Sequence, residues 1–160
     1  MEEIKVKTSS IIEFDVADLY PKHIVEFDLK PYLFQGIALK EKDFRTQIKQ
    51  VEWKSLKGDI LKIHCSEDVI LPAWVYPFIA NKANHFSYVY EASNQEQFLV
   101  SYYAQTFANL DWSQFENKRV LLRGCSSKNI PSSVYTEAAF YLGKVVKKLS
   151  YGEACSQVPL

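Results

Sequence analysis

The chain contains few of the residues that mark a known type of active site. Among its 160 residues are only 5 glycines, 3 cysteines and 1 methionine. It has no glycine-rich dinucleotide turn, no Walker loop, no His-Glu-x-x-His pair and no nucleophile elbow. The large enzyme classes that use these motifs therefore lack their usual signature in this sequence.

Neither an excess of charge nor a long apolar run is present. Basic and acidic residues number 19 each, so the formal net charge is zero. Because phosphate binding requires an excess of basic side chains, we expect no nucleic-acid partner. No apolar run approaches the ~20 residues that span a bilayer, and the first residues do not form a secretory signal. We therefore expect a cytoplasmic protein with reduced thiols and no membrane contact.

What the sequence does have is a hydrophobic content of 48%, ample for a core in a chain of 18.5 kDa. Segments with strand and helix periodicity alternate from residue 60 to residue 149. We predict one α/β domain, a mainly parallel three-layer sheet with an N-terminal strand-rich extension. Its predicted parts are N-terminal strands and a helix (1–51), a βαβαβα core (52–150) and a cysteine-containing tail (151–160).

Two pairs of segments in the chain resemble each other. Residues 12–16 (Ile-Glu-Phe-Asp-Val) and 25–29 (Val-Glu-Phe-Asp-Leu) both alternate apolar and acidic side chains, as half-buried strands do. Trp53 and Trp112 each precede a strand, a Cys-Ser pair, a proline and a helix. Duplication and the chance occurrence of two similar strand-to-helix units would both explain this pattern.

Cys65 and Cys125 each follow the carboxyl end of a predicted strand. Strands joined by helical crossovers run parallel, so their carboxyl ends meet at one sheet edge, where ligands commonly bind. We predict that these two strands are neighbours and that both thiols face one crevice. Cys155 follows the last helix, predicted from Pro131 to Leu149. It is therefore expected at the opposite edge, unless a second subunit brings it to the crevice.

Stretches along nearly the whole chain match the pattern of one family: Glu26-Phe27-Asp28-Leu29; residues 39–45; Cys65-Ser66 with Asp68, Ile70, Pro72, Trp74 and Tyr76; Gly124-Cys125 with Pro131 and Tyr135; and Tyr151-Gly152-Glu153 with Cys155-Ser156 and Val158-Pro159. On these residues the chain resembles the bacterial domain-of-unknown-function family 2480. The family has no established activity. The resemblance implies a bacterial protein encoded near iron–sulfur cluster assembly genes, with a role for all three cysteines.

The preferred interpretation is a thiolate-based metal-binding or iron–sulfur associated accessory protein. Cys65 and Cys125 would be ligands for zinc, iron or an iron–sulfur cluster, with Cys155 as a third ligand from the tail or from a partner subunit. A further ligand or outer contact would come from outside the chain or from one of three other side chains: Asp68, His64 or His85.

Two other interpretations stay open. The cysteines can be buried structural thiols in a non-catalytic interaction domain. Alternatively, Cys125 can be the nucleophile of a cysteine-dependent enzyme. His64 is expected on the opposite face of its strand from Cys65, which makes it a poor base for that thiol.

Partners are expected to be other proteins. Aromatic residues at helical spacing, Phe98 with Tyr102 and Tyr103, indicate either core packing or the face of a homo-oligomer. We expect a homodimer packed through an aromatic surface. The metal interpretation adds a protein partner that takes part in metal or iron–sulfur handling.

Overall fold

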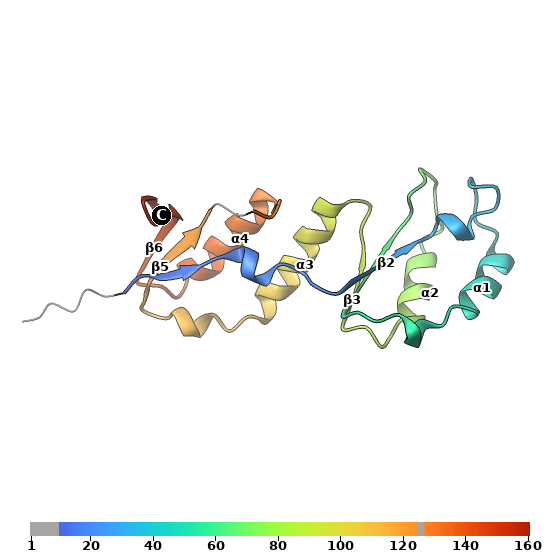
Figure 1. Cartoon of the computed structure of the whole chain (residues 1–160), viewed down its shortest axis with the longest axis horizontal. Helices are drawn as coiled ribbons and strands as arrows, with labels where there is room; N and C mark the ends of the chain where they lie inside the picture. The colour runs from blue at the N-terminus through green and yellow to red at the C-terminus, as the bar shows by residue number, and fades with distance from the viewer. Residues whose placement is uncertain (1–9, 125–126) are drawn as a thin grey trace, which may run out of the picture. The chain divides into compact units, whose positions relative to one another are not determined.

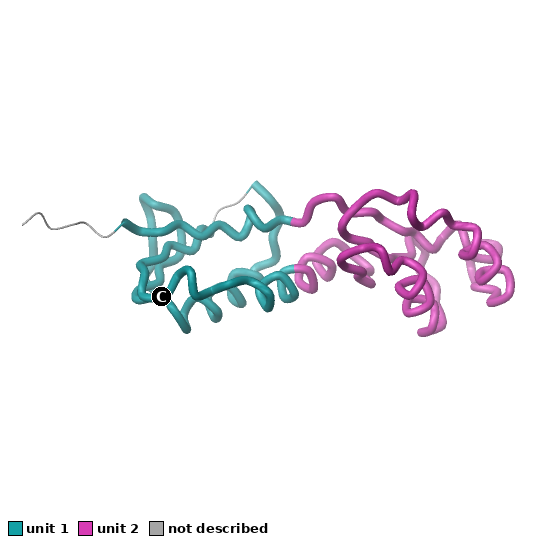
Figure 2. The backbone as a smooth tube through the Cα atoms, turned by 90° about the horizontal axis from the view of Figure 1, so that it is seen from below, with its two compact units in different colours: residues 1–20, 103–160 teal, residues 21–102 magenta. Residues whose placement is uncertain are grey.

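The structure is a computed structural model that describes residues 10–124 and 127–160. Two compact units make up the chain: unit 1 contains residues 1–20 and 103–160, and unit 2 contains residues 21–102 (Figure 2). Along the chain, unit 2 is therefore inserted after the first strand of unit 1. Each unit has its own sheet, and the predicted α/β fold with mainly parallel strands is confirmed.

Unit 2 is built on three parallel strands in the order β2-β3-β4 (Figure 1). The strands are β2 (Ile24–Asp28), β3 (Ile60–His64) and β4 (Tyr88–Glu91). The helical segments are η2 (Lys30–Tyr32), α1 (Glu41–Lys49), η3 (Trp53–Ser55), α2 (Val75–Lys82) and the start of α3 (Gln95–Asn109). Because the strands are parallel, their carboxyl ends share one edge of the sheet.

The alternation of side chains along β3 explains how this sheet is covered. Leu61 and Ile63 are 0% and 1% exposed and belong to a core cluster that includes residues of α1 and α2. Lys62 lies between them and points to the other face. There its Nζ is 3.3 Å from Oε1 of Gln95 in α3. Helices thus cover both faces of this sheet, in the predicted three-layer arrangement.

Unit 1 has four strands in the order β1-β5-β6-β7. The strands are β1 (Ile12–Phe14), β5 (Arg119–Arg123), β6 (Lys148–Glu153) and β7 (Ser156–Pro159). Its helical segments are η1 (Val16–Leu19), the end of α3, η4 (Trp112–Phe115) and α4 (Ser132–Gly143). All neighbouring strands run parallel except β6 and β7, which form an antiparallel hairpin.

Apart from the final strand β7 of unit 1, the two units repeat one order of elements: strand, 3-10 turn, helix, 3-10 turn, strand, helix, strand. Hydrogen bonds repeat as well. Asp15 and Asp28 each accept the backbone N–H two residues further on, at 2.9 and 3.0 Å. Trp53 and Trp112 each donate the ring N–H to the carbonyl five residues earlier, at 3.3 and 2.8 Å. The similarity between the two halves of the sequence therefore corresponds to a repeated architecture, which favours duplication.

The prediction that the strands before Cys65 and Cys125 are neighbours is wrong. β3 pairs with β2 and β4, whereas β5 pairs with β1 and β6. The two short N-terminal strands, expected as an extension, go to different sheets: β2 pairs with β3, and β1 pairs with β5. Periodicity identifies a strand and its buried face, but it carries no information about which strand is its neighbour.

The last helix is shorter than predicted. α4 ends at Gly143, and Lys148–Glu153 forms β6, which lies parallel to β5. Val145 and Leu149 have helical spacing, but the chain turns after Gly143 and Leu149 is buried as a strand residue.

In the described part of the chain, no helix combines the length and apolar character that a membrane span requires.

Candidate functional site

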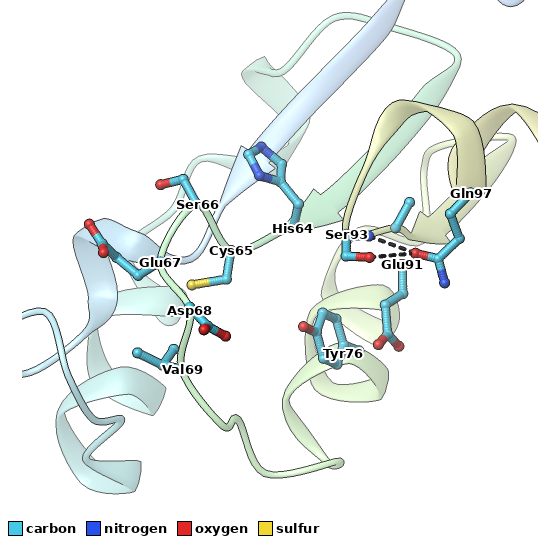
Figure 3. Close-up of a pocket in the computed structure, with 11 residues that line it drawn as sticks. His64, Cys65, Ser66, Glu67, Asp68, Val69, Tyr76, Glu91, Ser93 and Gln97 are labelled. Carbon is cyan, nitrogen blue, oxygen red and sulfur yellow. Dashed lines mark hydrogen bonds between the residues drawn. The ribbon is translucent and has the colours of Figure 1, made fainter.

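A pocket of about 420 Å³ lies in unit 2, where β3 and β4 end (Figure 3). It is the edge at which parallel strands present their carboxyl ends, the usual position of ligand sites in α/β sheets. The loop after β3, the start of α2 and the connection from β4 to α3 surround it. The lining residues are His64, Cys65, Ser66, Glu67, Asp68, Val69, Tyr76, Glu91, Ala92, Ser93 and Gln97.

The loop after β3 is attached to the end of β2 and to the turn that follows it. Asp28 accepts a hydrogen bond from the Ser66 backbone N–H at 3.0 Å and from the Ser66 hydroxyl at 2.6 Å. Lys30 forms an ion pair with Glu67, with 2.5 Å between Nζ and Oε1. Burial acts to raise the pKa of Asp28, but the hydrogen bonds from Ser66 and Lys30 outweigh it and hold this pKa below its usual value. These contacts attach the start of the pocket-lining loop to the end of β2 and to the turn after it.

Cys65 directly follows β3, as predicted, and its side chain is half-buried against the core of unit 2. Figure 3 shows the side chains of Cys65, Asp68, Tyr76 and Glu91 around the same open space. The carboxylates of Asp68 and Glu91 are exposed, and neither has a hydrogen bond or ion pair with any described residue. The pocket therefore carries a negative charge that the protein does not compensate locally.

Tyr76 contributes a neutral hydroxyl to this pocket. Burial raises its pKa, and electrostatic interactions with Glu91 and Cys65 raise it further. The phenol therefore keeps its proton at neutral pH. It can donate a hydrogen bond into the pocket while its ring supplies an apolar wall.

His64 lines the pocket, but its ring is directed away from Cys65 (Figure 3). Its Nε2 lies 3.6 Å from a carboxylate oxygen of Glu26, on the face of β3 that also carries Lys62. The expectation that His64 and Cys65 occupy opposite faces is confirmed. His64 is thus placed to pair with Glu26 and is not placed to act on the thiol.

Cys155 lies at a different place from the one predicted. It is exposed in the turn between β6 and β7, in unit 1, at the carboxyl end of β6. Because β6 runs parallel to β5, this is the same sheet edge at which Gly124 donates its N–H to the Gly152 carbonyl, at 3.3 Å. The prediction of an opposite edge is wrong because the chain returns as a strand after α4 instead of continuing as a helix.

Cys125 lies outside the described residues, so its predicted role as a ligand has no structural account. Its position along the chain can still be compared with that of Cys65. Cys65 directly follows His64, the last residue of β3, whereas Cys125 comes two residues after Arg123, the last residue of β5. In the repeat, Cys65 therefore corresponds to Gly124 and not to Cys125.

The predicted ligands come together only in part. Cys65 and Asp68 share the pocket, His64 lines it with its ring directed away from Cys65, and Cys155 belongs to the other unit. Within residues 10–124 and 127–160, no three His, Cys, Asp or Glu side chains are close enough to hold a metal ion as they stand. Sequence reasoning missed Glu91. It is the last residue of β4, and the rule that placed Cys65 at the carboxyl edge also applies to it.

The whole chain matches one family. The family described as protein of unknown function (DUF2480) matches residues 2–160. No curated protein and no solved structure matches the chain. The match covers both units, and it confirms the resemblance seen in the sequence. The chain belongs to the DUF2480 family of proteins of unknown function.

Proposed function

We propose that the unit 2 pocket binds a cation, and that the protein is a thiolate-based metal-binding accessory protein. The observation that supports this proposal is that one thiol, Cys65, and two carboxylates without an ion-pair partner among the described residues, Asp68 and Glu91, line the same open pocket. A divalent cation would neutralise both carboxylates and use the sulfur as a third donor. Zinc and ferrous iron accept this mixture of sulfur and oxygen ligands.

The flexibility of the ligands supports this proposal. Asp68 and Glu91 are exposed, so their side chains are free to turn towards a bound ion, whereas the half-buried Cys65 is held at the end of β3. The ion would recruit the two carboxylates around a thiol that is already in place. Coordination lowers the pKa of a thiol and releases its proton, so binding is expected to weaken at acidic pH.

Cobalt(II) titration under anaerobic conditions tests the proposal. Cobalt replaces zinc in thiolate sites and gives a sulfur-to-metal absorption band, so the wild-type protein should develop this band in a saturable way. Cys65→Ser should remove the band, and Asp68→Asn combined with Glu91→Gln should weaken cobalt binding by about tenfold or more. Cys155→Ser is the matched control, because that exposed thiol lies in unit 1.

Two results would overturn the metal proposal. One is a wild-type protein that binds neither cobalt, zinc nor ferrous iron when its thiols are reduced. The other is a cobalt band that survives in Cys65→Ser and disappears in Cys155→Ser, because the metal would then be held outside the pocket.

A second candidate is a non-catalytic interaction domain in which Cys65 is structural. The observation in its favour is that Cys65 packs against the core of unit 2. In that case Cys65→Ser should lower the thermal stability of the protein while no metal binds. A cysteine-dependent enzyme has less support, because the ring of His64 is directed away from Cys65 and is not placed to act on its thiol.

The remaining features of the proposal rest on the charge composition, on the aromatic residues that indicate an oligomer, and on the family resemblance, which implies the link to iron–sulfur cluster assembly. With 19 basic and 19 acidic residues, the chain lacks the positive excess that nucleic-acid binding needs. We propose a cytoplasmic protein that works as a homo-oligomer and meets a protein partner in zinc or iron handling, including iron–sulfur cluster assembly.

A further inference from the structure

Another pocket, of about 420 Å³, lies in unit 1 at the edge of the sheet where β1, β5 and β6 begin. Because these three strands are parallel, this edge is opposite to the one that carries Cys155. The side chains around the pocket are three cations, one amide, one hydroxyl and one apolar group: Lys118, Arg119, Lys147, Asn117, Ser10 and Ile12. None of these described lining residues is acidic.

The positive charge of this pocket is a local feature, since the whole chain has 19 basic and 19 acidic residues. Lys118 and Lys147 are exposed, and neither forms an ion pair with any described residue. Like charges that share one pocket repel each other, which costs free energy unless an anion compensates them. The cluster is therefore not explained by a contribution to stability.

Unit 2 contains the equivalent edge, and its backbone is built in the same way. There the carbonyl of Asp59, the residue before β3, accepts the backbone N–H groups of residues 87–88, at 3.0 and 3.2 Å. In unit 1 the carbonyl of Lys118, the residue before β5, accepts those of residues 147–148, at 2.8 and 3.4 Å. The first residues of the two paired strands also face each other in both units.

The side chains on this shared backbone differ in charge. In place of Lys118, Arg119 and Lys147, unit 2 has Asp59, Ile60 and Ser87. Because the same backbone forms with an acidic, an apolar and a hydroxyl side chain, the fold does not require three cations at these positions. The repeat thus separates what builds this edge from what the unit 1 pocket adds to it, which is positive charge.

The donors of the pocket suit a tetrahedral oxyanion. Nζ of Lys118 donates to the Gln114 carbonyl at 2.6 Å, which holds the ammonium in place and leaves two of its three N–H groups to a ligand. Arg119 supplies a guanidinium, whose planar array of N–H groups matches phosphate oxygens. Asn117 adds an amide N–H donor directly before these two residues.

We propose that this pocket binds the phosphate group of a small molecule. The two lysines and the arginine would neutralise the phosphate, and Asn117 and Ser10 would donate further hydrogen bonds to its oxygens. Ile12 offers an apolar wall to the rest of the molecule. The volume lies in the range of pockets that hold one small ligand. A nucleic acid would need an extended basic surface, which a chain with equal numbers of acidic and basic residues does not supply.

This proposal is independent of metal binding, because every residue it uses lies in unit 1 and the cation pocket lies in unit 2. It is also independent of the aromatic face expected from the sequence. Phe98 and Tyr103 of α3 are both 0% exposed, so these two rings belong to the core and cannot form an oligomer interface.

Isothermal titration calorimetry of the full chain with inorganic pyrophosphate tests the proposal. Metal-free protein is used, because pyrophosphate chelates divalent cations. Wild-type protein should bind one pyrophosphate per chain in a saturable way, with an affinity that falls as the salt concentration rises. Lys147→Ser and Lys118→Asp introduce the side chains that unit 2 has at these positions, and each should weaken binding by about tenfold or more.

Lys57→Ser is the matched control. Lys57 is exposed in unit 2, and its Nζ donates to the Lys54 carbonyl at 3.2 Å, as that of Lys118 does to Gln114. This variant should bind pyrophosphate as the wild type does, and so should Cys65→Ser, which separates this site from the metal site. Without pyrophosphate, Lys147→Ser should melt at the wild-type temperature or above it, because the repulsion between the cations is reduced.

Three results would overturn the phosphate proposal. The first is a wild-type protein that binds neither pyrophosphate nor inorganic phosphate. The second is an affinity that both Lys147→Ser and Lys118→Asp leave unchanged, because the anion would then be held elsewhere. The third is binding to phosphatidic acid vesicles or to a single-stranded oligonucleotide without binding of pyrophosphate, because the basic residues would then serve a membrane or a nucleic acid.

Discussion

The attachment of the pocket loop to β2 can be tested by replacing Asp28. One oxygen of its carboxylate accepts the backbone N–H groups of Lys30 and Ser66, each at 3.0 Å, and the other accepts the Ser66 hydroxyl at 2.6 Å. A hydrogen bond to an ionised group contributes about 1.5–3 kcal/mol when buried and much less where water competes. Because Ser66 is exposed, we expect Asp28→Ala to lower the free energy of unfolding by about 2 kcal/mol. Asp28→Asn keeps one acceptor oxygen and should cost about 1 kcal/mol.

The same substitution has a pH dependence of known sign. The pKa of Asp28 in the folded protein lies below its usual value of 3.8, because hydrogen bonds from Ser66 and Lys30 outweigh the effect of burial. A carboxyl group of this kind stabilises the fold fully at pH values above its unfolded pKa, and the contribution is lost as the pH falls through the folded pKa. The difference in unfolding free energy between wild type and Asp28→Asn should therefore be constant near neutral pH and shrink below pH 3.8.

Urea denaturation followed by circular dichroism measures both effects, and site-resolved alkylation of Cys65 reports the state of the loop. Asp28→Ala should accelerate alkylation, because the loop loses its attachment. Asp111→Ala is a matched control: Asp111 accepts the N–H and hydroxyl of Ser113 at 3.0 and 2.6 Å, but within one turn of unit 1. The reasoning is refuted if Asp28→Ala costs less than about 0.5 kcal/mol and leaves the alkylation rate of Cys65 at the wild-type value.

Three further substitutions test contacts inside one unit or the other, with thermal and urea denaturation as the measurement. Gly124→Ala should destabilise the fold by about 1–3 kcal/mol, because a Cβ would lie 2.5 Å from Cζ of Tyr151; a neutral result would mean that this ring moves freely. Tyr103→Phe should cost about 1–2 kcal/mol, because the buried hydroxyl donates to the Val16 carbonyl at 2.8 Å, and an unchanged midpoint would contradict this. Lys62→Met should be neutral or slightly stabilising, since Lys62 is only 7% exposed and its ammonium forms an ion pair with Glu26 at 3.1 Å; a large loss of stability would show that this ion pair is required.

Part of the candidate site follows from the sequence. Cys65 stands directly after a run of branched and apolar residues, so its position at a carboxyl strand end is predicted and confirmed. Asp68 follows within the same short loop and lines the same pocket. Glu91 and Tyr76 reach the pocket from other elements. Their convergence with Cys65 depends on strand pairing and helix placement, which local periodicity does not contain.

The error over Cys155 has a local cause. Apolar residues at positions 145, 146 and 149 fit a helical stripe and a strand equally well, and short apolar runs are ambiguous between the two. Only the pairing of β6 with β5 and β7 decides for the strand. Because residues 148–153 form a strand parallel to β5, Cys155 lies at the carboxyl edge of the sheet and not at the predicted opposite edge.

The sequence by itself determined the α/β class, the parallel character of most strands, the repeat of elements and the position of Cys65 at a strand end. These depend on spacing along the chain, because side chains alternate in a strand and recur every third or fourth residue in a helix. Tertiary structure alone decided that β1 and β2 go to different sheets and that Glu91 joins Cys65 at one pocket. Several strands have the same apolar pattern, so the choice among pairings rests on contacts between distant residues, which bury more surface in one arrangement than in the others.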